Sequence, residues 1–280
     1  MKTIITTIAL LLTFSINAQN FQGKAIYKTS RKSNFKISSN TAGVNDKMQD
    51  EIQKRIQKMN QKTFVLEFDK HTSTYKEEVA LKTPNPKAGK NNVMVMSFGG
   101  SGGSGIYYKN IQDKRFSNQT EIMGKRFLVK DKLPEHKWKL SSETKNIGTY
   151  TCYKATYSKE VERKNISFNN GETIEDIKKE TIVTTAWYTM QIPVSNGPKN
   201  YQGLPGLILE INDGEKTIVC TEITLNPSEK VTITEPLKGK IVSQKKYDEI
   251  QDKKSKEMMD NLKSRTGFDL GNGTTIKIGG

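Results

Sequence analysis

The sequence predicts a mainly β (α+β) fold, namely a curved, mostly antiparallel sheet or partial barrel with one or two covering helices. Three observations predict it. Short runs rich in Val, Ile, Thr, Tyr and Phe alternate with turn residues along most of the chain, which is typical of antiparallel strands. Strands and helices do not alternate as they would in a parallel βαβ sheet. Only two segments, one near each end, show the period of a helix.

The first residues, MKTIITTIALLLTFSINAQN, have the pattern of an export signal. Lys2 precedes an apolar stretch from Ile4 to Ile16, and Ala18 is the small residue that a signal peptidase requires. The apolar stretch is too short for a comfortable transmembrane helix and lacks a basic flank. We therefore expect a signal peptide at residues 1–18, no transmembrane anchor and an exported protein, either periplasmic or secreted.

The first mature segment, GKAIYKTSRK, has the alternation of a strand, with Ala25 and Tyr27 on one face and Ile26 on the other. Between residues 46 and 60 the period changes to that of a helix. One narrow apolar stripe runs along this helix and is formed by Met48, Ile52, Ile56 and Met59. The stripe favours a helix that lies on a sheet, and a helix on a membrane surface is the alternative.

Further strands follow this helix. The segments KTFVLEFDK and STYKEEVAL form a predicted pair around a turn at Asp69 to His71. The remaining strands of this half are expected at residues 93–98, 105–110 and 125–131. Residues 136–158 have the pattern of strand, turn and strand, with the bend near 146–149.

The C-terminal half continues the β pattern and then changes to a helix. A long β-rich run, ETIVTTAWYTMQIP, ends at Pro193, and KTIVCTEITL forms another expected strand. Residues 245–262 have helical composition, with one apolar side formed by Tyr247, Ile250, Met258 and Leu262. We expect a single β-rich domain at residues 19–270 and a flexible tail at 271–280.

The stretch GLPGLI, residues 203–208, places a tight turn directly before one of the most apolar segments of the chain. Its two glycines adopt positive φ easily, and Pro205 disfavours a helix at Leu204. The next segment puts apolar side chains on both faces of a strand, through Leu207, Ile208, Leu209 and Ile211. This pattern predicts a strand covered on both sides. We interpret the hexapeptide as a folding device, and close approach of glycine backbone to a ligand is the alternative.

These residues identify a family resemblance. The hexapeptide, the strand IGTYTCYKATY and the succession AWYTMQIPVSNGPKNYQ resemble the GLPGLI family, exported proteins common in Bacteroidetes. The resemblance covers residues 146–225 and implies an exported, β-rich, envelope-associated protein, with a curved sheet like that of periplasmic lipoprotein carriers. It implies no activity. The matching motif residues, which we expect to be structural, are Trp187, Tyr188, Ile192, Pro193, Gly197, Pro198, Gly203, Leu204, Pro205, Gly206, Leu207 and Ile208.

The residues that usually carry chemistry are sparse. The two histidines, His71 and His136, lie far apart without metal-ligand spacing, and we expect both to be exposed rather than catalytic. The stretch FGGSGGSG matches the letters of a dinucleotide fingerprint and, at Ser101, of a nucleophile elbow. Both motifs require a helix next, whereas IYYKN is β-like. We therefore interpret this stretch as a hairpin loop and expect no cofactor and no metal.

Two further features leave alternatives open. Glu210 interrupts the apolar strand after the hexapeptide. We expect it to face solvent, and an inward-facing Glu210 would need an Arg or Lys partner. The mature chain has two cysteines, Cys152 and Cys220, which in an oxidising compartment form either a disulfide or two separate buried thiols.

The formal net charge of +15 comes from lysines scattered along every segment. An exported protein meets little nucleic acid, so we expect no nucleic-acid partner and a solvated surface that attracts anionic lipid or polysaccharide. The sequence thus indicates an exported envelope protein, a non-enzymatic binding or structural module for an apolar ligand, a glycan or a protein partner. The alternative is an exported hydrolase whose site the sequence does not reveal.

Overall fold

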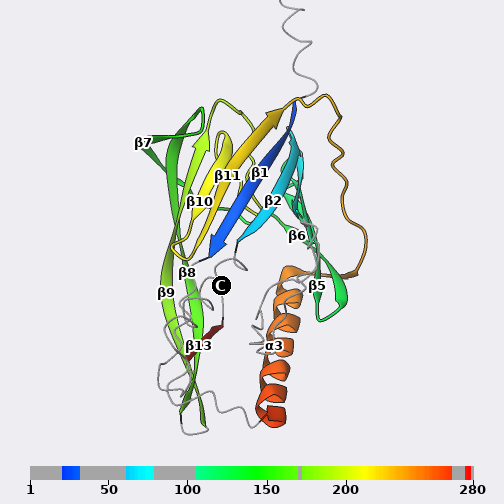
Figure 1. Cartoon of the computed structure of the whole chain (residues 1–280), viewed down its shortest axis with the longest axis vertical. Helices are drawn as coiled ribbons and strands as arrows, with labels where there is room; N and C mark the ends of the chain where they lie inside the picture. Colours follow the sequence, from blue (N-terminus) through cyan, green and yellow to red (C-terminus); the bar gives the residue numbers. More distant parts are fainter. Residues whose placement is uncertain (1–20, 32–60, 79–104, 170–171, 267–274, 279–280) are drawn as a thin grey trace, which may run out of the picture.

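A computed structural model of the chain describes residues 21–31, 61–78, 105–169, 172–266 and 275–278 (Figure 1). These residues form strands and, within this part of the chain, a single helix, α3 (Gln244–Thr266). The strands are β1 (Gln22–Arg31), β2 (Lys62–Asp69), β3 (Thr72–Glu77), β4 (Ile106–Asn110), β5 (Arg115–Ile122), β6 (Lys125–Lys132), β7 (Lys139–Ile147), β8 (Tyr150–Asn169), β9 (Glu172–Thr189), β10 (Leu207–Asn212), β11 (Lys216–Leu225), β12 (Lys240–Val242) and β13 (Thr275–Ile278).

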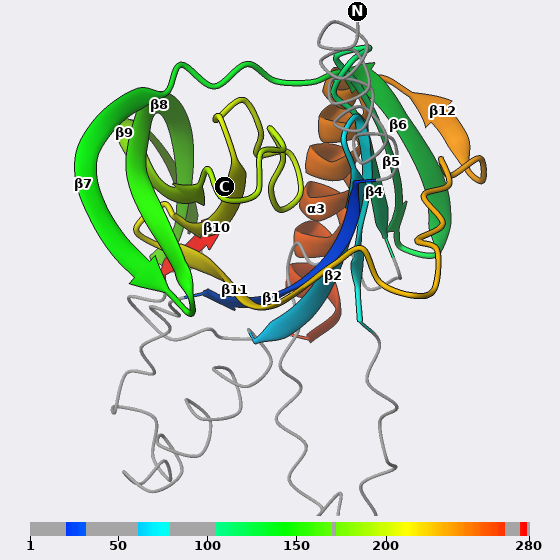
Figure 2. The same cartoon turned by 90° about the horizontal axis from the view of Figure 1, so that it is seen from above.

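All of these strands belong to one sheet. Its order is β12-β6-β5-β4-β3-β2-β1-β11-β10-β9-β8-β13, and β7 pairs with β8 beside this path. The pairs are antiparallel, except that the short β12 runs parallel to β6. Seen from above, the sheet curls from β7 and β8 through β11 and β1 to β6 without closing (Figure 2). The predicted fold class, a curved and mostly antiparallel sheet, is confirmed.

The alternation of apolar residues gives the buried face of the sheet. Ala25 and Tyr27 are fully buried and Ile26 is only partly buried, as their spacing in β1 predicts. The β2–β3 hairpin turns where expected, because the Asp69 carboxylate accepts hydrogen bonds from the backbone N–H groups of His71, at 2.7 Å, and Thr72, at 2.6 Å. The buried side chains of these strands form the core on the concave face, and the core continues into β8 to β11.

The two strands of the β8–β9 hairpin are longer than the sequence predicts. The sequence indicates two strands that end near residue 158 and begin near residue 180, whereas the structure pairs Tyr153 with Tyr188 and continues without a break to Asn169 and Glu172. Polar side chains here obscure the alternation on which the prediction depends, yet the backbone pairing continues through them.

Helix α3 lies against β6, at the end of the sheet opposite β8 (Figures 1 and 2). The helix begins after Ser243, whose hydroxyl accepts a hydrogen bond from the backbone N–H of Lys246 at 3.2 Å and so caps the first turn. The Tyr247 ring contacts the Phe127 ring edge-on, with centroids 5.8 Å apart. The predicted C-terminal helix is confirmed, and Tyr247 of its predicted apolar side lies against the sheet at this contact.

Several expectations fall elsewhere in the chain. The signal peptide, the helix with its Met48 to Met59 stripe, the strand at 93–98 and the Gly-rich stretch around Ser101 lie outside the described residues. Within the segment expected as a flexible tail, Thr275–Ile278 form β13 and pair with Lys164 to Ser167 of β8. That part of the tail is therefore paired rather than free.

Candidate functional site

The connection between β9 and β10, residues 190–206, lies inside the curve of the sheet (Figure 2). It contains no strand or helix, but Ile192, Val194 and Leu204 are buried. Backbone hydrogen bonds hold it together and join it to β10: the Asn196 N–H donates to the Val194 carbonyl at 2.7 Å, and the Ile208 N–H donates to the Asn196 carbonyl at 2.9 Å. We name residues 190–206 the core loop, because they fill the concave face as part of the core.

Side chains from the opposite strands hold the core loop in place. The Lys109 amino group on β4 donates to the carbonyl oxygens of Gly197, at 2.6 Å, and Tyr201, at 3.0 Å. The Ser73 hydroxyl on β3 donates to the Asn196 side-chain oxygen at 3.3 Å. Lys109 is 0% exposed, and this burial lowers its pKa well below the usual value. The loop therefore connects the two sides of the curved sheet.

A second set of contacts joins the core loop to the segment before β7. The Trp138 indole N–H donates to the Gln202 carbonyl at 2.9 Å. The prediction that His136 is exposed is wrong, because its ring is partly buried. The Nε2 atom of the ring lies 3.1 Å from the Asn200 carbonyl oxygen, and the ring stacks on Tyr201 with centroids 5.5 Å apart. Burial lowers the pKa of His136. The sequence places this residue beside Pro134 and Glu135, which gives no signal of an aromatic environment. His71, in contrast, is exposed as expected.

The two glycines of the hexapeptide meet different requirements. Gly203 has φ +93°, a conformation that L side chains rarely adopt. Gly206 is needed for space, because a Cβ there would lie 2.0 Å from the carbonyl oxygen of Thr189 at the end of β9. These glycines let the chain turn out of the core loop and pass directly beside β9 into β10. At Gly206 the structure shows close approach of the backbone to the end of β9.

The motif residues are distributed between the core loop and its flanking strands. Trp187 and Tyr188 lie in β9. Gly197 and Pro198 are buried, whereas Pro193 and Pro205 are exposed at the turns. Leu204, Leu207 and Ile208 are buried, and β10 lies between β9 and β11 with Leu209 and Ile211 also buried. The strand is therefore covered on both faces.

Glu210 differs from its expected solvent-facing position. Its carboxylate is 18% exposed and forms an ion pair with Lys145 of β7, with N and O 2.7 Å apart. The Lys145 amino group also lies 4.5 Å from the centroid of the Trp187 ring. The pairing of β10 with β9 shifts between Ile208 and Glu210, where Leu209 has no partner of its own on β9. Glu210 thus has the basic partner that an inward orientation requires.

Both cysteines are buried free thiols. Burial raises the pKa of Cys152 to about 11 and that of Cys220 to about 12. Neither is therefore an activated nucleophile.

Within the described residues, no group of three or more His, Cys, Asp and Glu side chains is arranged to hold a metal ion. Lys109 is enclosed by the core loop, so a substrate reaches its amino group only if that loop leaves.

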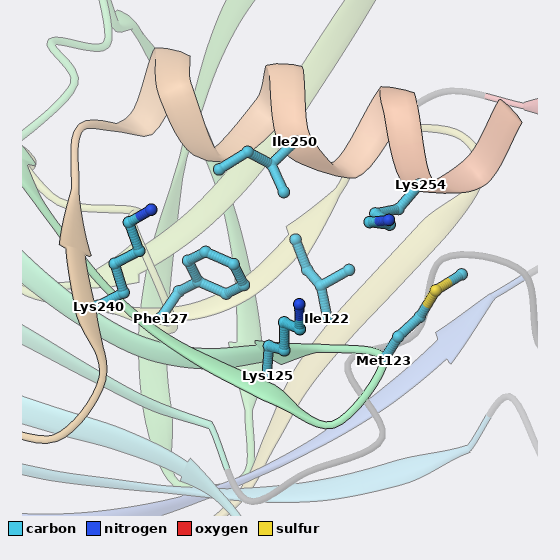
Figure 3. A pocket seen from close by; sticks show the side chains of 7 residues that line it. All are labelled: Ile122, Met123, Lys125, Phe127, Lys240, Ile250 and Lys254. Carbon is cyan, nitrogen blue, oxygen red and sulfur yellow. The ribbon is translucent and has the colours of Figure 1, made fainter. Parts of the chain in front are cut away.

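A pocket of about 400 Å³ lies away from the motif, between α3 and the β5–β6 hairpin (Figure 3). We name it the helix pocket. Ile250 and Lys254 project into it from α3, Phe127 and Lys125 come from β6, and the remaining lining residues are Ile122, Met123 and Lys240. Its volume lies within the range of about 300–1,000 Å³ of small-molecule sites. Ile250 is on the apolar face that the sequence predicts, but β12, which supplies Lys240, is too short to be recognised from its pattern.

The helix pocket combines apolar walls with positive charge. Its lining contains three lysines and no acidic residue. Lys254 forms an ion pair with Glu257 on the same helix, whereas Lys125 and Lys240 are exposed and form no ion pair with other described residues. Met123, at the β5–β6 turn, is 59% exposed, so the apolar surface of the pocket continues to its mouth.

In the described part of the chain, α3 included, no helix is both long and apolar enough to cross a membrane.

Comparisons with known proteins give the following matches. The model of a family described as "Protein of unknown function (Porph_ging)" matches residues 138–210, a span that contains the core loop and the hexapeptide. A search of curated proteins found no match.

Among solved structures, PNGF-II in its C2 and P21 crystal forms is 12% identical, with TM-scores of 0.45 and 0.44 over 84% of this chain. The chain spans about a third of the length of PNGF-II, 33% and 34% in the two forms. LprF from Mycobacterium bovis is 10% identical, with a TM-score of 0.25, and the match covers 79% of this chain and 92% of LprF.

Proposed function

We propose that this chain is an exported envelope protein of the GLPGLI type that binds an apolar ligand in the helix pocket without chemical turnover. The proposal takes the chain as one β-rich domain after a signal peptide at residues 1–18. The apolar N-terminal stretch followed by Ala18 supports export.

The observation that supports the proposal most strongly is the contrast between the concave face of the sheet and the helix pocket. The concave face of the sheet, where a carrier with a curved sheet would hold its ligand, is filled by the core loop and fastened by Lys109. The part of the chain that the structure describes leaves the helix pocket open, and Ile122, Phe127 and Ile250 give it apolar walls. Apolar walls with a few polar groups are the usual composition of a ligand site.

The hydrolase alternative requires a nucleophile beside a base. His136 contacts the Asn200 carbonyl and aromatic rings, and His71 is an exposed turn residue. The described residues therefore favour binding over hydrolysis. Turnover of ester, amide or glycosidic probes by the purified protein would reverse this preference.

Binding of the neutral fluorescent probe N-phenyl-1-naphthylamine to the mature protein tests the proposal. Ile250→Trp fills the pocket, and we expect it to weaken probe binding at least about 10-fold, since an apolar contact of this size is worth about 1–3 kcal/mol. Val183→Trp, on an exposed site of β9, is the matched control and should bind like the parent. Equal affinity of all three proteins, or absence of probe binding, would contradict the proposal, provided that thermal unfolding shows both variants folded.

A further inference from the structure

The charge of the helix pocket narrows the class of ligand, if the proposed binding function holds. Apolar side chains from β5, β6 and α3 form its walls, and every ionisable group in its lining is a lysine. Figure 3 shows the lysine side chains arranged around Phe127, Ile122 and Ile250 rather than gathered at one point. A neutral ligand would gain nothing from this charge.

Ion pairing leaves part of this charge available. Glu257 compensates Lys254, so the positive charge not paired within the described chain belongs to Lys125 of β6 and Lys240 of β12. These two lysines come from neighbouring parallel strands, since Lys240 pairs in register with Phe127, two residues from Lys125. These two residues therefore lie at the same end of the sheet, and Figure 3 shows their side chains on either side of Phe127.

We infer that the helix pocket binds a single-chain anionic amphiphile, with the alkyl chain on Ile122, Phe127 and Ile250 and the anionic head group at Lys125 and Lys240. The apolar walls account for the chain and the two lysines account for the head group. The shared chemistry is one alkyl chain ending in a carboxylate or a phosphate. Since both lysines are exposed, the head group stays near water and avoids the cost of burying a charge. Its attraction is consequently sensitive to salt.

The test uses four C12 ligands that differ in the head group, measured with the full mature protein by calorimetry at low ionic strength. These are dodecanoate, dodecyl phosphate, dodecanol and dodecyltrimethylammonium. We expect the anions to bind at least about 10-fold more tightly than the alcohol and the cation to bind most weakly, with the anion preference reduced at 0.5 M salt. A preference between dodecanoate and dodecyl phosphate identifies the head group.

The double variant Lys125→Gln and Lys240→Gln should lower anion affinity about 10-fold and leave dodecanol affinity unchanged. The double variant Lys24→Gln and Lys28→Gln, at two exposed lysines on β1, removes the same charge; it is the control and should leave both affinities unchanged. Equal binding of anions and alcohol by the parent protein would overturn the head-group inference while leaving the apolar pocket intact. Failure of all four ligands to bind would instead overturn the proposed function. An equal loss of anion affinity in the Lys24→Gln and Lys28→Gln control would show that the effect comes from net charge alone and would overturn the role of Lys125 and Lys240.

Discussion

The Lys109 amino group lies 2.6 Å from the carbonyl oxygen of Gly197 and joins β4 to a loop 88 residues later in the sequence. This contact places a lysine in the interior of a β-sheet protein, without a carboxylate partner among the described residues. Its hydrogen bonds instead satisfy two carbonyl groups of the core loop, which has no strand partner for them.

Replacement of Lys109 by Met should destabilise the fold by about 2 kcal/mol, because it leaves the buried carbonyls of Gly197 and Tyr201 without a donor. The effect should also depend on pH. The folded-state pKa of Lys109 lies below the usual 10.5, so between these two values the unfolded chain binds more protons than the folded one. The free energy of unfolding therefore rises with pH in this window.

Guanidinium unfolding from pH 7 to 9.5 checks this expectation. The slope should be smaller in Lys109→Met than in the parent, whereas Lys28→Met on the exposed face of β1 should keep the parental slope. Measurements stop short of pH 10, where buried tyrosines with raised pKa values, such as Tyr75 and Tyr107, begin to stabilise the folded state less. An unchanged slope in Lys109→Met would show that this amino group is not buried.

Gly206→Ala should cost at least about 3 kcal/mol, since its Cβ would overlap the Thr189 carbonyl, which belongs to backbone and cannot move aside cheaply. Gly124→Ala is the control. Gly124 has φ +80° with no atom within 4 Å of an added Cβ, so only backbone strain of about 1–2 kcal/mol is expected. Chemical unfolding of both variants measures the difference, and similar losses would mean that Gly206 has no close neighbour.

Glu210 and Lys145 should show a coupling free energy of about 1 kcal/mol in a double-mutant cycle with Glu210→Gln and Lys145→Met, because the pair is partly buried and Lys145 also contacts Trp187. Glu143 and Lys154 form the comparison pair, with Glu143 61% exposed, and should couple less. Additive single effects at Glu210 and Lys145 would place the Glu210 carboxylate in solvent.

The two thiols should react very slowly with a water-soluble disulfide reagent at pH 8 in the folded protein, since burial raises their pKa values to about 11 and about 12. Unfolding in guanidinium without reductant should release both to fast reaction. Detection of no thiol in the unfolded, unreduced protein would reveal a bridge between Cys152 and Cys220.

The sequence patterns predict the strands well and the core loop poorly, for a physical reason. β1 and β10 show their buried faces through the alternation of Ala25 with Tyr27 and through the run from Leu207 to Ile211. Such alternation reports which side of a strand is covered. It does not report what covers it. The core loop has no period, and the residue that fastens it, Lys109, is distant in sequence and of a type usually found at the surface.

The candidate site was predictable only in part for the same reason. Ile250 lies on the expected apolar side of α3, but Lys240 reaches the helix pocket through the parallel pairing of β12 with β6. That pairing involves three residues of β12, and a segment so short has no readable alternation. The partial burial of Glu210 was likewise not predicted, because its partner Lys145 comes from β7 and alternation along β10 does not report a contact from another strand.

Native-state hydrogen exchange of the Asn196 and Ile208 amides tests most directly whether the core loop belongs to the core. Both N–H groups are bonded within the loop region, and we expect their opening free energies to fall within about 1 kcal/mol of global unfolding. Exchange of these two amides at the rate of an unprotected surface loop, while the remaining amides of β10 stay protected, would contradict the account.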